Sequence, residues 1–394
     1  MKQIFVLAIL ISTVYATKEA LDEFVLGNRK FTADVYKEVL KLSSGNFLVS
    51  PLSAETVLAL ALEGSNGETS EELIRGLKFP STKEKTSSAI KSLLPQLNLA
   101  TNGELELQST NKMYVNKNYP LKDNYKLLAK STYMSEVENI NFAEGAKAAS
   151  AINKWVDEKT NHKINKIVEE TSLTNDVKVV LINTLYFLGK WLNPFDTIDT
   201  LPKKFFLSTN DSVVVETMHT SEYFNYYENK DLQATFLEMP YAGGDATMTI
   251  VLPDKNIQLA DVEQKLEEVL KPQPYKPERV AVAIPKFSVE SQVKFVPILK
   301  NMGIKKAFTG GEADFSGIGG KKGDLYISDI IQKTFINVTE TGTEAASATA
   351  GLVALLSAPI VHKNTANFIA NRPFLYTVKH TSGTILFVGR YCSK

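Results

Sequence analysis

The sequence predicts an α+β protein, because helical patterns dominate the first half of the chain and strand patterns the second. The chain has 394 residues, of which 44% are apolar and 22% charged, the balance of an ordinary globular protein with a large core. The length alone would allow two or three domains, but no flexible linker and no fixed-period repeat divides the sequence. We therefore expect one large domain.

The first sixteen residues have the pattern of a secretory signal peptide. Lys2 supplies the positive start, residues 4–14 the apolar run, and Val14-Tyr15-Ala16 a small-residue cleavage pattern. A membrane anchor is the alternative, but the apolar run falls short of the roughly 20 residues needed to span a bilayer. We expect cleavage after Ala16, a secreted extracellular protein, a single domain over residues 17–394, and no membrane partner.

Helices are expected early in the mature chain. Residues 19–42 place apolar side chains close to a helical stripe, and residues 52–62 repeat that character. Thr69 with Glu72 three residues on makes a capping box, which predicts that a further helix starts there and runs through Leu73 and Leu77.

Strands follow from the middle of the chain onward. Residues 178–187 are mostly apolar and β-branched, as in a strand covered on both faces. Asn183 and Thr184 lie within this run, so a buried polar network that crosses the sheet is predicted. Residues 246–252 and 280–284 add two strands that end at Pro253 and Pro285.

A long segment separates two strand-like runs near the C-terminus, residues 334–338 and 368–378. The gap of about 30 residues far exceeds the usual loop of ~4–6 residues, and a loop of that length is normally functional. Residues 344–356 also contain good helix formers, so a short helix broken at Gly351 is the alternative from local pattern.

Charge and composition argue against several partners. Lys plus Arg and Asp plus Glu number 44 each and are interspersed, so nothing favours nucleic acid. Lys203-Lys204 and Lys321-Lys322 could belong to an anionic-ligand patch, but short charge pairs are usually solvated surface.

Cysteine and histidine give no metal or cofactor site. Cys392 is the one cysteine and reads as an ordinary thiol, and the four histidines have no ligand spacing. Asn210 and Asn337 begin glycosylation sequons, the first in a turn-like stretch and the second, less favourably, in a strand-like run.

Seven motifs, in order from about residue 21 to the end of the chain, resemble those of the serpin family. They are NFLVSPLS (46–53), NTLYFLGKW with PF (183–191, 194–195), PKF (285–287), LKNMGI (299–304), ADFS (313–316), ETGTEAA (340–346) and FIANRPF (368–374). The resemblance implies three β-sheets, about nine helices and an exposed reactive-centre loop at about residues 340–367. It also implies a single-use inhibitor, most simply a monomer, whose partner is a serine protease.

In that family the protease attacks the loop and forms an acyl-enzyme, and the cut loop then enters the main sheet as an added strand. The resemblance assigns the hinge of the loop to Glu340, Gly342, Thr343, Glu344, Ala345, Ala346, Ser347, Ala348 and Thr349. The family pattern sends Thr343, Ala345, Ser347, Thr349, Gly351 and Val353 toward the core. These residues are small or uncharged, and Glu344 falls on the outward side, which favours insertion.

Family spacing also places the cleaved bond sixteen residues after the hinge glutamate, between Leu356 and Ser357. Leucine suits an apolar pocket of the chymotrypsin, cathepsin G or elastase type and disfavours a trypsin-like pocket. Leu355 and Val353 lie in the same apolar run and remain alternative sites of cleavage.

The family resemblance further places a sheet-opening region at Ser50, Ser53, Asn183, Trp191 and Gln332. Gln332 stands where relatives commonly have histidine, so the network keeps a donor and an acceptor but loses a titrating group. Two further departures are Thr341, in place of an acidic residue, and a longer stretch at residues 357–367.

Two other functions compete with that of an inhibitor. An enzyme lacks support, since the chain has no nucleophile-elbow, zinc-protease or complete phosphate-loop motif. The serious rival is a binding or carrier serpin that does not insert its loop, for which a charged or bulky residue at Thr343 or Ala345 would have been the signal.

Overall fold

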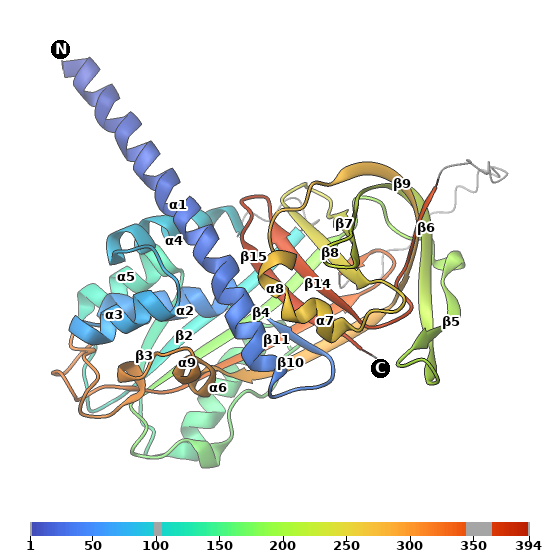
Figure 1. Cartoon of the computed structure of the whole chain (residues 1–394). Helices are drawn as coiled ribbons and strands as arrows, with labels where there is room; N and C mark the ends of the chain where they lie inside the picture. The colour runs from blue at the N-terminus through green and yellow to red at the C-terminus, as the bar shows by residue number, and fades with distance from the viewer. Residues whose placement is uncertain (1, 98–104, 344–364, 393–394) are drawn as a thin grey trace.

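The computed structural model describes residues 2–97, 105–343 and 365–392, with side chains for all of these except residues 2–15 and 106–108. This part of the chain contains nine α-helices and fifteen strands, so the predicted α+β class is confirmed. The strands form a six-stranded sheet in the centre and a nine-stranded network beside it (Figure 1).

The six-stranded sheet has the order β10-β11-β12-β4-β2-β3. Its strands are β10 (Phe287–Lys294), β11 (Ile327–Val338), β12 (Gly342–Thr343), β4 (Val179–Lys190), β2 (Leu105–Asn116) and β3 (Glu136–Ile140). β11 and β4 pair directly in parallel over most of their length, and β12 lies between them at one end. The sheet therefore has a seam that is closed along most of its length and already occupied at the end where β12 lies.

The nine-stranded network consists of two parts that share the long strand β6 (Ser212–Asn229). One part runs β1-β15-β14-β8-β7, and the other adds β5, β9 and β13. Together with the six-stranded sheet they account for the three sheets that the family resemblance implies. Their bounds are β1 Phe47–Val49, β5 Leu201–Phe206, β7 Ala234–Pro240, β8 Ala246–Pro253, β9 Lys276–Pro285, β13 Ala366–Ile369, β14 Phe374–His380 and β15 Ile385–Tyr391.

Helices cover both faces of the six-stranded sheet. Val180 and Ile182 of β4 pack in one apolar cluster with α6, whereas Leu181 and Leu185 join the main core that includes α2. Burial on both faces explains why the sequence of β4 reads as an almost continuous apolar run. The helices are α1 Lys2–Leu40, α2 Pro51–Gly64, α3 Gly67–Gly76, α4 Lys83–Leu97, α5 Asp123–Tyr133, α6 Gly145–Lys159, α7 Leu259–Gln264, α8 Leu266–Val269 and α9 Phe295–Asn301.

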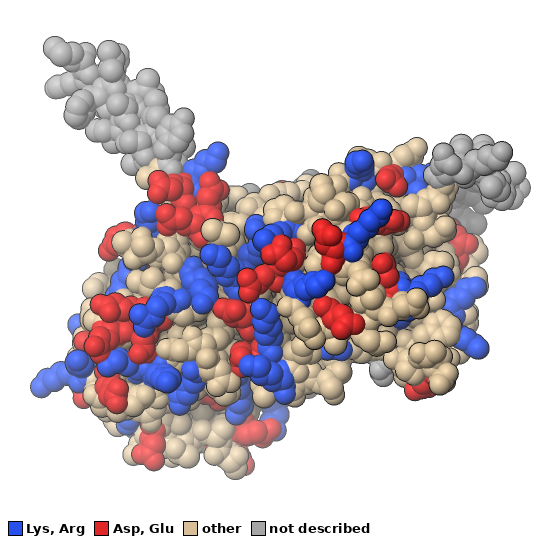
Figure 2. All heavy atoms as spheres, viewed as in Figure 1, with Lys and Arg blue, Asp and Glu red and all other residues tan. Residues whose placement is uncertain are grey.

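The helices predicted over residues 19–42 and 52–62 are found as the second part of α1 and as α2. The predicted cleavage point after Ala16 falls inside α1. Among the described residues, no helix combines the length and the apolar character that a membrane crossing requires. Lysine, arginine and carboxylate side chains are intermixed over the face shown in Figure 2.

The predicted capping box at Thr69 and Glu72 is wrong. Helix α3 begins at Gly67, with Asn66 in the cap position, so both residues lie inside the helix. Both side chains instead accept tertiary hydrogen bonds. The Thr69 hydroxyl accepts from the backbone N–H of Asp314, and Glu72 accepts from the backbone N–H groups of Lys305 and Lys306. The two side chains therefore bind backbone N–H groups of residues 305–314 and do not cap the helix.

Two strands differ from their predicted extent. The run at residues 368–378 is divided into β13 and β14, since β13 ends at Ile369 and β14 begins only after Pro373. The run at residues 334–338 extends backward to Ile327. The strands predicted at 178–187, 246–252 and 280–284 lie within β4, β8 and β9, apart from Lys178, which precedes β4.

A carboxyl group is buried in the core beneath the six-stranded sheet. Glu55 of α2 is fully buried, and its Oε2 accepts a 2.6 Å bond from the side-chain amide of Asn28, while Oε1 has no partner within the described residues. Burial raises the pKa of Glu55 well above its ordinary value, and the bond from Asn28 opposes that rise only in part. The group is therefore held in its neutral form over a wide range of pH.

This burial predicts a pH-dependent effect of Glu55→Gln on stability. The raised native pKa means that native protein holds a proton which unfolded protein releases above about pH 4.3. Wild-type stability should thus fall as pH rises through the native pKa, whereas the glutamine variant should not show that loss. We expect the variant to gain several degrees in melting midpoint relative to wild type at pH 8 and less at pH 5.

Calorimetry across that pH range measures this difference. The exposed Glu71→Gln on α3 is the matched control and should not alter the slope with pH. An equal effect of Glu55→Gln at both pH values would contradict a neutral Glu55.

Candidate functional site

The predicted hinge begins between the ends of strands β11 and β4 in the six-stranded sheet. Gly342 and Thr343 form β12, which pairs with Val338 of β11 on one side and with Gly189 and Lys190 of β4 on the other. Both pairings are antiparallel. The hinge therefore already has the strand direction that further insertion between β11 and β4 would need.

Gly342 is required by the close approach of β4. A Cβ atom at this position would lie 2.0 Å from the backbone oxygen of Gly189, and the φ of 153° is also one that other residues rarely adopt. Both the backbone contact and the dihedral exclude a side chain. The glycine of the hinge motif thus allows the first inserted residue to pair tightly with β4.

Thr343 lies on the core side of the sheet, the side that the family pattern predicts for it. It is 1% exposed, and its hydroxyl lies 2.7 Å from the hydroxyl of Tyr241. Tyr241 stacks on Trp191 with ring centroids 4.5 Å apart and meets Phe187 edge-on. Burial raises the pKa of Tyr241 well above its ordinary value, so this hydroxyl stays protonated and available to Thr343. The inward position thus holds a small polar side chain beside the aromatic cluster of Tyr241, Trp191 and Phe187.

Trp191 holds the turn that leads into β12. Its backbone N–H donates to the oxygen of Thr341 at 3.0 Å, and its indole N–H donates to the oxygen of Thr339 at 2.9 Å. The side chain of Thr341 is exposed, so an uncharged residue at this position leaves both backbone bonds intact. The tryptophan thus positions the hinge through backbone bonds that do not depend on the hinge side chains.

Glu340 closes the same turn from the opposite side. Its carboxylate accepts from the Thr200 hydroxyl at 2.9 Å and lies 3.0 Å from the ammonium group of Lys286, and its backbone oxygen accepts from the N–H of Phe195. Burial disfavours ionisation of Glu340, but the backbone bond, Lys286 and Thr200 together keep its pKa below the ordinary value. Glu340 is thus ionised and connects the residues after β11 to Thr200, which precedes β5, and to Lys286. We call these contacts the Glu340 clasp.

A second polar group crosses the seam between β11 and β4 further along the strands. Gln332 faces Asn183 in the parallel register, and its amide donates to the Asn183 oxygen at 2.6 Å. It also donates to the backbone oxygen of Ser50 at 2.8 Å and accepts from the Ser50 N–H at 2.9 Å. Gln332 is 1% exposed, so a single uncharged amide joins both strands to the start of α2.

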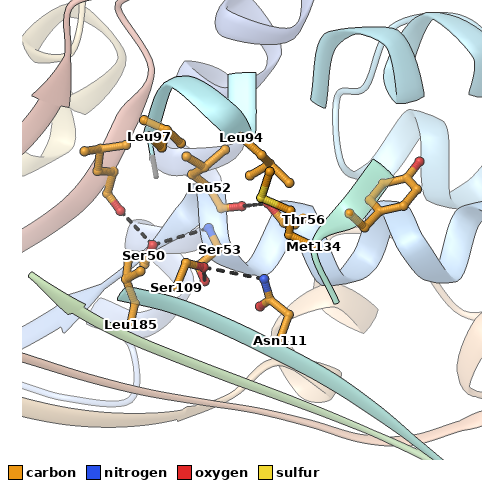
Figure 3. A pocket seen from close by; sticks show the side chains of 12 residues that line it. Ser50, Leu52, Ser53, Thr56, Leu94, Leu97, Ser109, Asn111, Met134 and Leu185 are labelled. Atoms are coloured by element: carbon orange, nitrogen blue, oxygen red, sulfur yellow. Dashed lines mark hydrogen bonds between the residues drawn. The ribbon is translucent and has the colours of Figure 1, made fainter. Parts of the chain in front are cut away.

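The same network continues to β2. The Asn183 amide donates to the Ser53 hydroxyl and to Asn111 of β2, and the Ser53 hydroxyl lies 3.0 Å from that of Ser109. Figure 3 shows Ser50 and Ser53 at the start of α2 close to Ser109 and Asn111, and all four line a small cavity. Leucine side chains of α4 are among its other lining residues. The buried polar network predicted from Asn183 and Thr184 is therefore found around Asn183, but the prediction is wrong for Thr184, whose buried hydroxyl has no partner within the described residues.

Some predicted residues lie elsewhere. Residues 344–364 fall outside the described part of the chain. These include the bait residues Leu356 and Ser357, the alternative cleavage sites Val353 and Leu355, and the remaining hinge residues Glu344, Ala345, Ala346, Ser347, Ala348 and Thr349. The alternative of a short helix broken at Gly351 falls there as well. The structure does not bear on these assignments, which stay predictions.

The two sequons occupy different surroundings. Asn210 is exposed in the turn between β5 and β6, whereas Asn337 is half-buried within β11 and faces Ser288 of β10.

The lone thiol of Cys392 accepts from the Arg390 guanidinium at 3.0 Å, and burial raises its pKa although Arg390 opposes this. Within the described residues, no three His, Cys, Asp or Glu side chains come together as metal ligands.

Sequence reasoning missed several residues of this site, and they share one property: each lies far in sequence from the residue of the hinge or of the Asn183 network that it contacts. They are Lys286, Thr200, Tyr241, Ser109 and Asn111. Only Lys286 gave a signal, since it forms part of the motif at residues 285–287.

Comparison with known families and structures agrees with this geometry. The profile of the family described as Serpin (serine protease inhibitor) matches residues 26–394. The chain is a member of the serpin family. An uncharacterized serpin-like protein of Thermococcus kodakarensis is 38% identical over 367 residues, which cover 91% of this chain and 83% of that protein.

Solved serpin structures superimpose over almost the whole chain. Serpin48 of the insect Tenebrio molitor, described as a highly specific serpin, has a TM-score of 0.87 at 43% identity and covers 95% of this chain and 98% of its own. Thyroxine-binding globulin in complex with thyroxine has a TM-score of 0.81 at 25% identity, with 94% and 98% covered. The fold of this serpin is thus shared by relatives with different functions.

The network around Gln332 predicts a large effect of Gln332→Leu on the stability of this serpin. The variant would leave the Ser50 N–H, the Ser50 oxygen and the Asn183 oxygen without the partner that they share. We expect a loss of about 2 kcal/mol or more, because buried polar groups left unpaired cost about 1–3 kcal/mol each. Denaturant unfolding measures the loss. The exposed Gln96→Leu on α4 should remain within about 0.5 kcal/mol of wild type.

A loss for Gln332→Leu no larger than that of the control would show that the network does not hold the sheet.

The clasp at Glu340 predicts a measurable coupling to Lys286. In a double-mutant cycle of Glu340→Gln and Lys286→Gln we expect a coupling of about 1 kcal/mol at pH 7. Because the native pKa of Glu340 is lowered, its contribution is present at neutral pH and disappears as pH falls through that native value. Chemical denaturation at neutral and acidic pH checks both the size and the direction.

Lys271→Gln, which removes an exposed ion pair with Glu268 far from the hinge, serves as the control partner and should show no coupling to Glu340. A cycle with no coupling between Glu340 and Lys286 at pH 7 would refute the clasp.

Proposed function

We propose that this serpin is a secreted single-use inhibitor of a serine protease with chymotrypsin-, cathepsin G- or elastase-like specificity. The protease serine attacks the carbonyl of Leu356, Ser357 leaves with the new amino group, and Leu356 remains esterified to the enzyme. The loop then inserts between β11 and β4 and carries the bound protease with it. Distortion of the protease's catalytic geometry stalls hydrolysis of the ester.

The position of β12 is the observation that carries this proposal. The hinge already occupies the end of the seam, in the right direction, with Gly342 against β4 and Thr343 buried beside Tyr241. The remaining seam consists of the β11–β4 pairing, and each pair would open to admit one residue of the following loop. Relatives named as inhibitors, such as serine protease inhibitor 42Dd of Drosophila melanogaster, support the same reading.

The second candidate is a binding or carrier serpin, and the structural likeness to thyroxine-binding globulin with its thyroxine favours considering it. A protein of that kind would be cut in its loop without trapping the protease. The two candidates therefore differ in the product of one reaction.

Mixing the protein with chymotrypsin and running a denaturing gel separates the two candidates. We expect a stable band of higher mass and, from mass spectrometry, a released fragment that begins at Ser357. We also expect the cleaved protein to melt well above the intact one, since insertion relieves a kinetically trapped state. Clean cleavage with no higher-mass band and no gain in melting temperature would refute inhibition.

A matched pair of hinge variants tests loop insertion itself. Thr343→Arg places a cation at this buried position, where burial of an unpaired charge costs several kcal/mol. We therefore expect the loop to be cleaved and the complex band to be reduced at least about tenfold. Thr341→Arg adds the same charge two residues earlier at an exposed position and should form complex like wild type. Equal complex formation by both variants would contradict insertion on the predicted side. The gel assay above provides the readout.

A further inference from the structure

The sheet formed by β5, β6, β9 and β13 curls into a ring. Antiparallel and parallel pairings join the four strands in that order, and the backbone N–H of Phe206 at the end of β5 donates to the oxygen of Asn371 just beyond β13 at 2.8 Å. The concave side of this ring holds about 1330 Å³ of space, part of it open to solvent. The ring lies at the side of the molecule away from α3 and α5 (Figure 1).

Strand register shows which side chains face this concavity. Residues directly opposed in a sheet point to the same face, and the pairs Lys203–Val215 and His219–Ala283 share the face on which Ile369 also lies. Apolar side chains on this face are the nearly buried Val215 and Ala283 and the half-exposed Ile369, whereas Phe205 is fully buried against Tyr391. The concave side therefore offers an apolar wall that is partly open to solvent.

The mouth of the pocket is polar and mainly cationic. Lys203 lies on the concave face, and Lys204 borders the pocket from the other face of the edge strand β5. Both are exposed, and within the described residues neither lysine pairs with a carboxylate. His219 lies on the opposite wall, where its Nδ1 donates to the backbone oxygen of Asp199 at 2.8 Å. Asp199 is the single acidic residue among those that line the pocket in the described part of the chain. Unpaired lysines beside an apolar wall favour a ligand with an anionic head and an apolar body.

Exposed apolar side chains gather on the same strands. Of the large apolar residues that are exposed in the described part of the chain, six lie on the 3-10 helix η2 (Thr197–Asp199) or on strands β5, β6 and β13. They are Ile198, Leu201, Phe206, Val214, Tyr223 and Ile369. By strand register Leu201, Tyr223 and Ile369 lie on the concave face, whereas Phe206 and Val214 lie on the opposite face. The first three therefore add exposed apolar surface on the side of the sheet that holds the pocket.

We propose that the concave face of the β5–β6–β9–β13 ring binds a small amphipathic anion, a carboxylate or sulfate on an apolar chain or ring. The apolar body lies on Val215, Ala283 and Ile369, and the anionic group lies near Lys203, while Lys204 adds positive charge at the edge of the pocket. The site is separate from the seam between β11 and β4 and does not require that the protein inhibit a protease.

Isothermal titration of the full chain with laurate, kept below its micelle concentration, tests the site. We expect saturable one-to-one binding of laurate, and no binding of dodecylamine, which has the same chain with a cationic head. Lys203→Glu combined with Lys204→Glu should weaken laurate binding at least about fivefold through loss of charge attraction. Ala281→Trp, at a half-exposed position that lines the pocket, should abolish it by filling the space.

Lys321→Glu combined with Lys322→Glu makes the same charge change at an exposed site outside the pocket and should leave laurate binding unaltered. The melting midpoint of each variant establishes that it is folded. Absence of laurate binding by wild type up to about 1 mM would overturn the proposal, as would equal weakening by the control pair. Binding of wild type to phosphatidylglycerol vesicles without binding of laurate would also overturn it, in favour of a membrane contact.

Discussion

The parallel pairing of β11 with β4 is the interaction on which the rest of the structure depends. This ladder closes the six-stranded sheet, yet β12 separates the same two strands at one end. A strand that enters between them must break each β11–β4 hydrogen bond, but it replaces every broken bond with pairs on both of its sides. The closed seam is thus the arrangement with fewer strand pairings.

Polar groups at the seam suit such an exchange better than apolar ones. Gln332 and Asn183 meet across it and both also contact the residues that begin α2, so their bonds can shift between partners without leaving a void. A tightly packed apolar contact at the same place would lose dispersion energy over its whole surface once the strands separated. Gln332 also carries no titrating proton, so this part of the seam holds equally well across physiological pH.

Sequence patterns were sufficient where burial is uniform and failed where a polar residue has a distant partner. The run in β4 identified a central strand because both faces are covered, and Asn183 within it identified the buried network. Thr69 and Glu72 gave a false helix start, since their spacing satisfies backbone N–H groups of residues 305–314, which no local window includes. The contacts of Glu340 with Thr200 and Lys286 were not predicted either, because both partners lie far from Glu340 in the sequence.

The hinge and the curled ring share one short segment of chain. Thr200 donates to Glu340, whereas its neighbour Asp199, the last residue of η2, accepts from His219 at the wall of the pocket. The end of η2 and the residue after it therefore contact one site each. Beyond the loop, β13 returns directly into the same ring. A displacement of η2 would therefore alter the Glu340 clasp and the pocket mouth together. Linkage between two sites is reciprocal. If a ligand in the pocket favours one position of η2 and so stabilises one state of the hinge, that state of the hinge strengthens ligand binding by the same free energy.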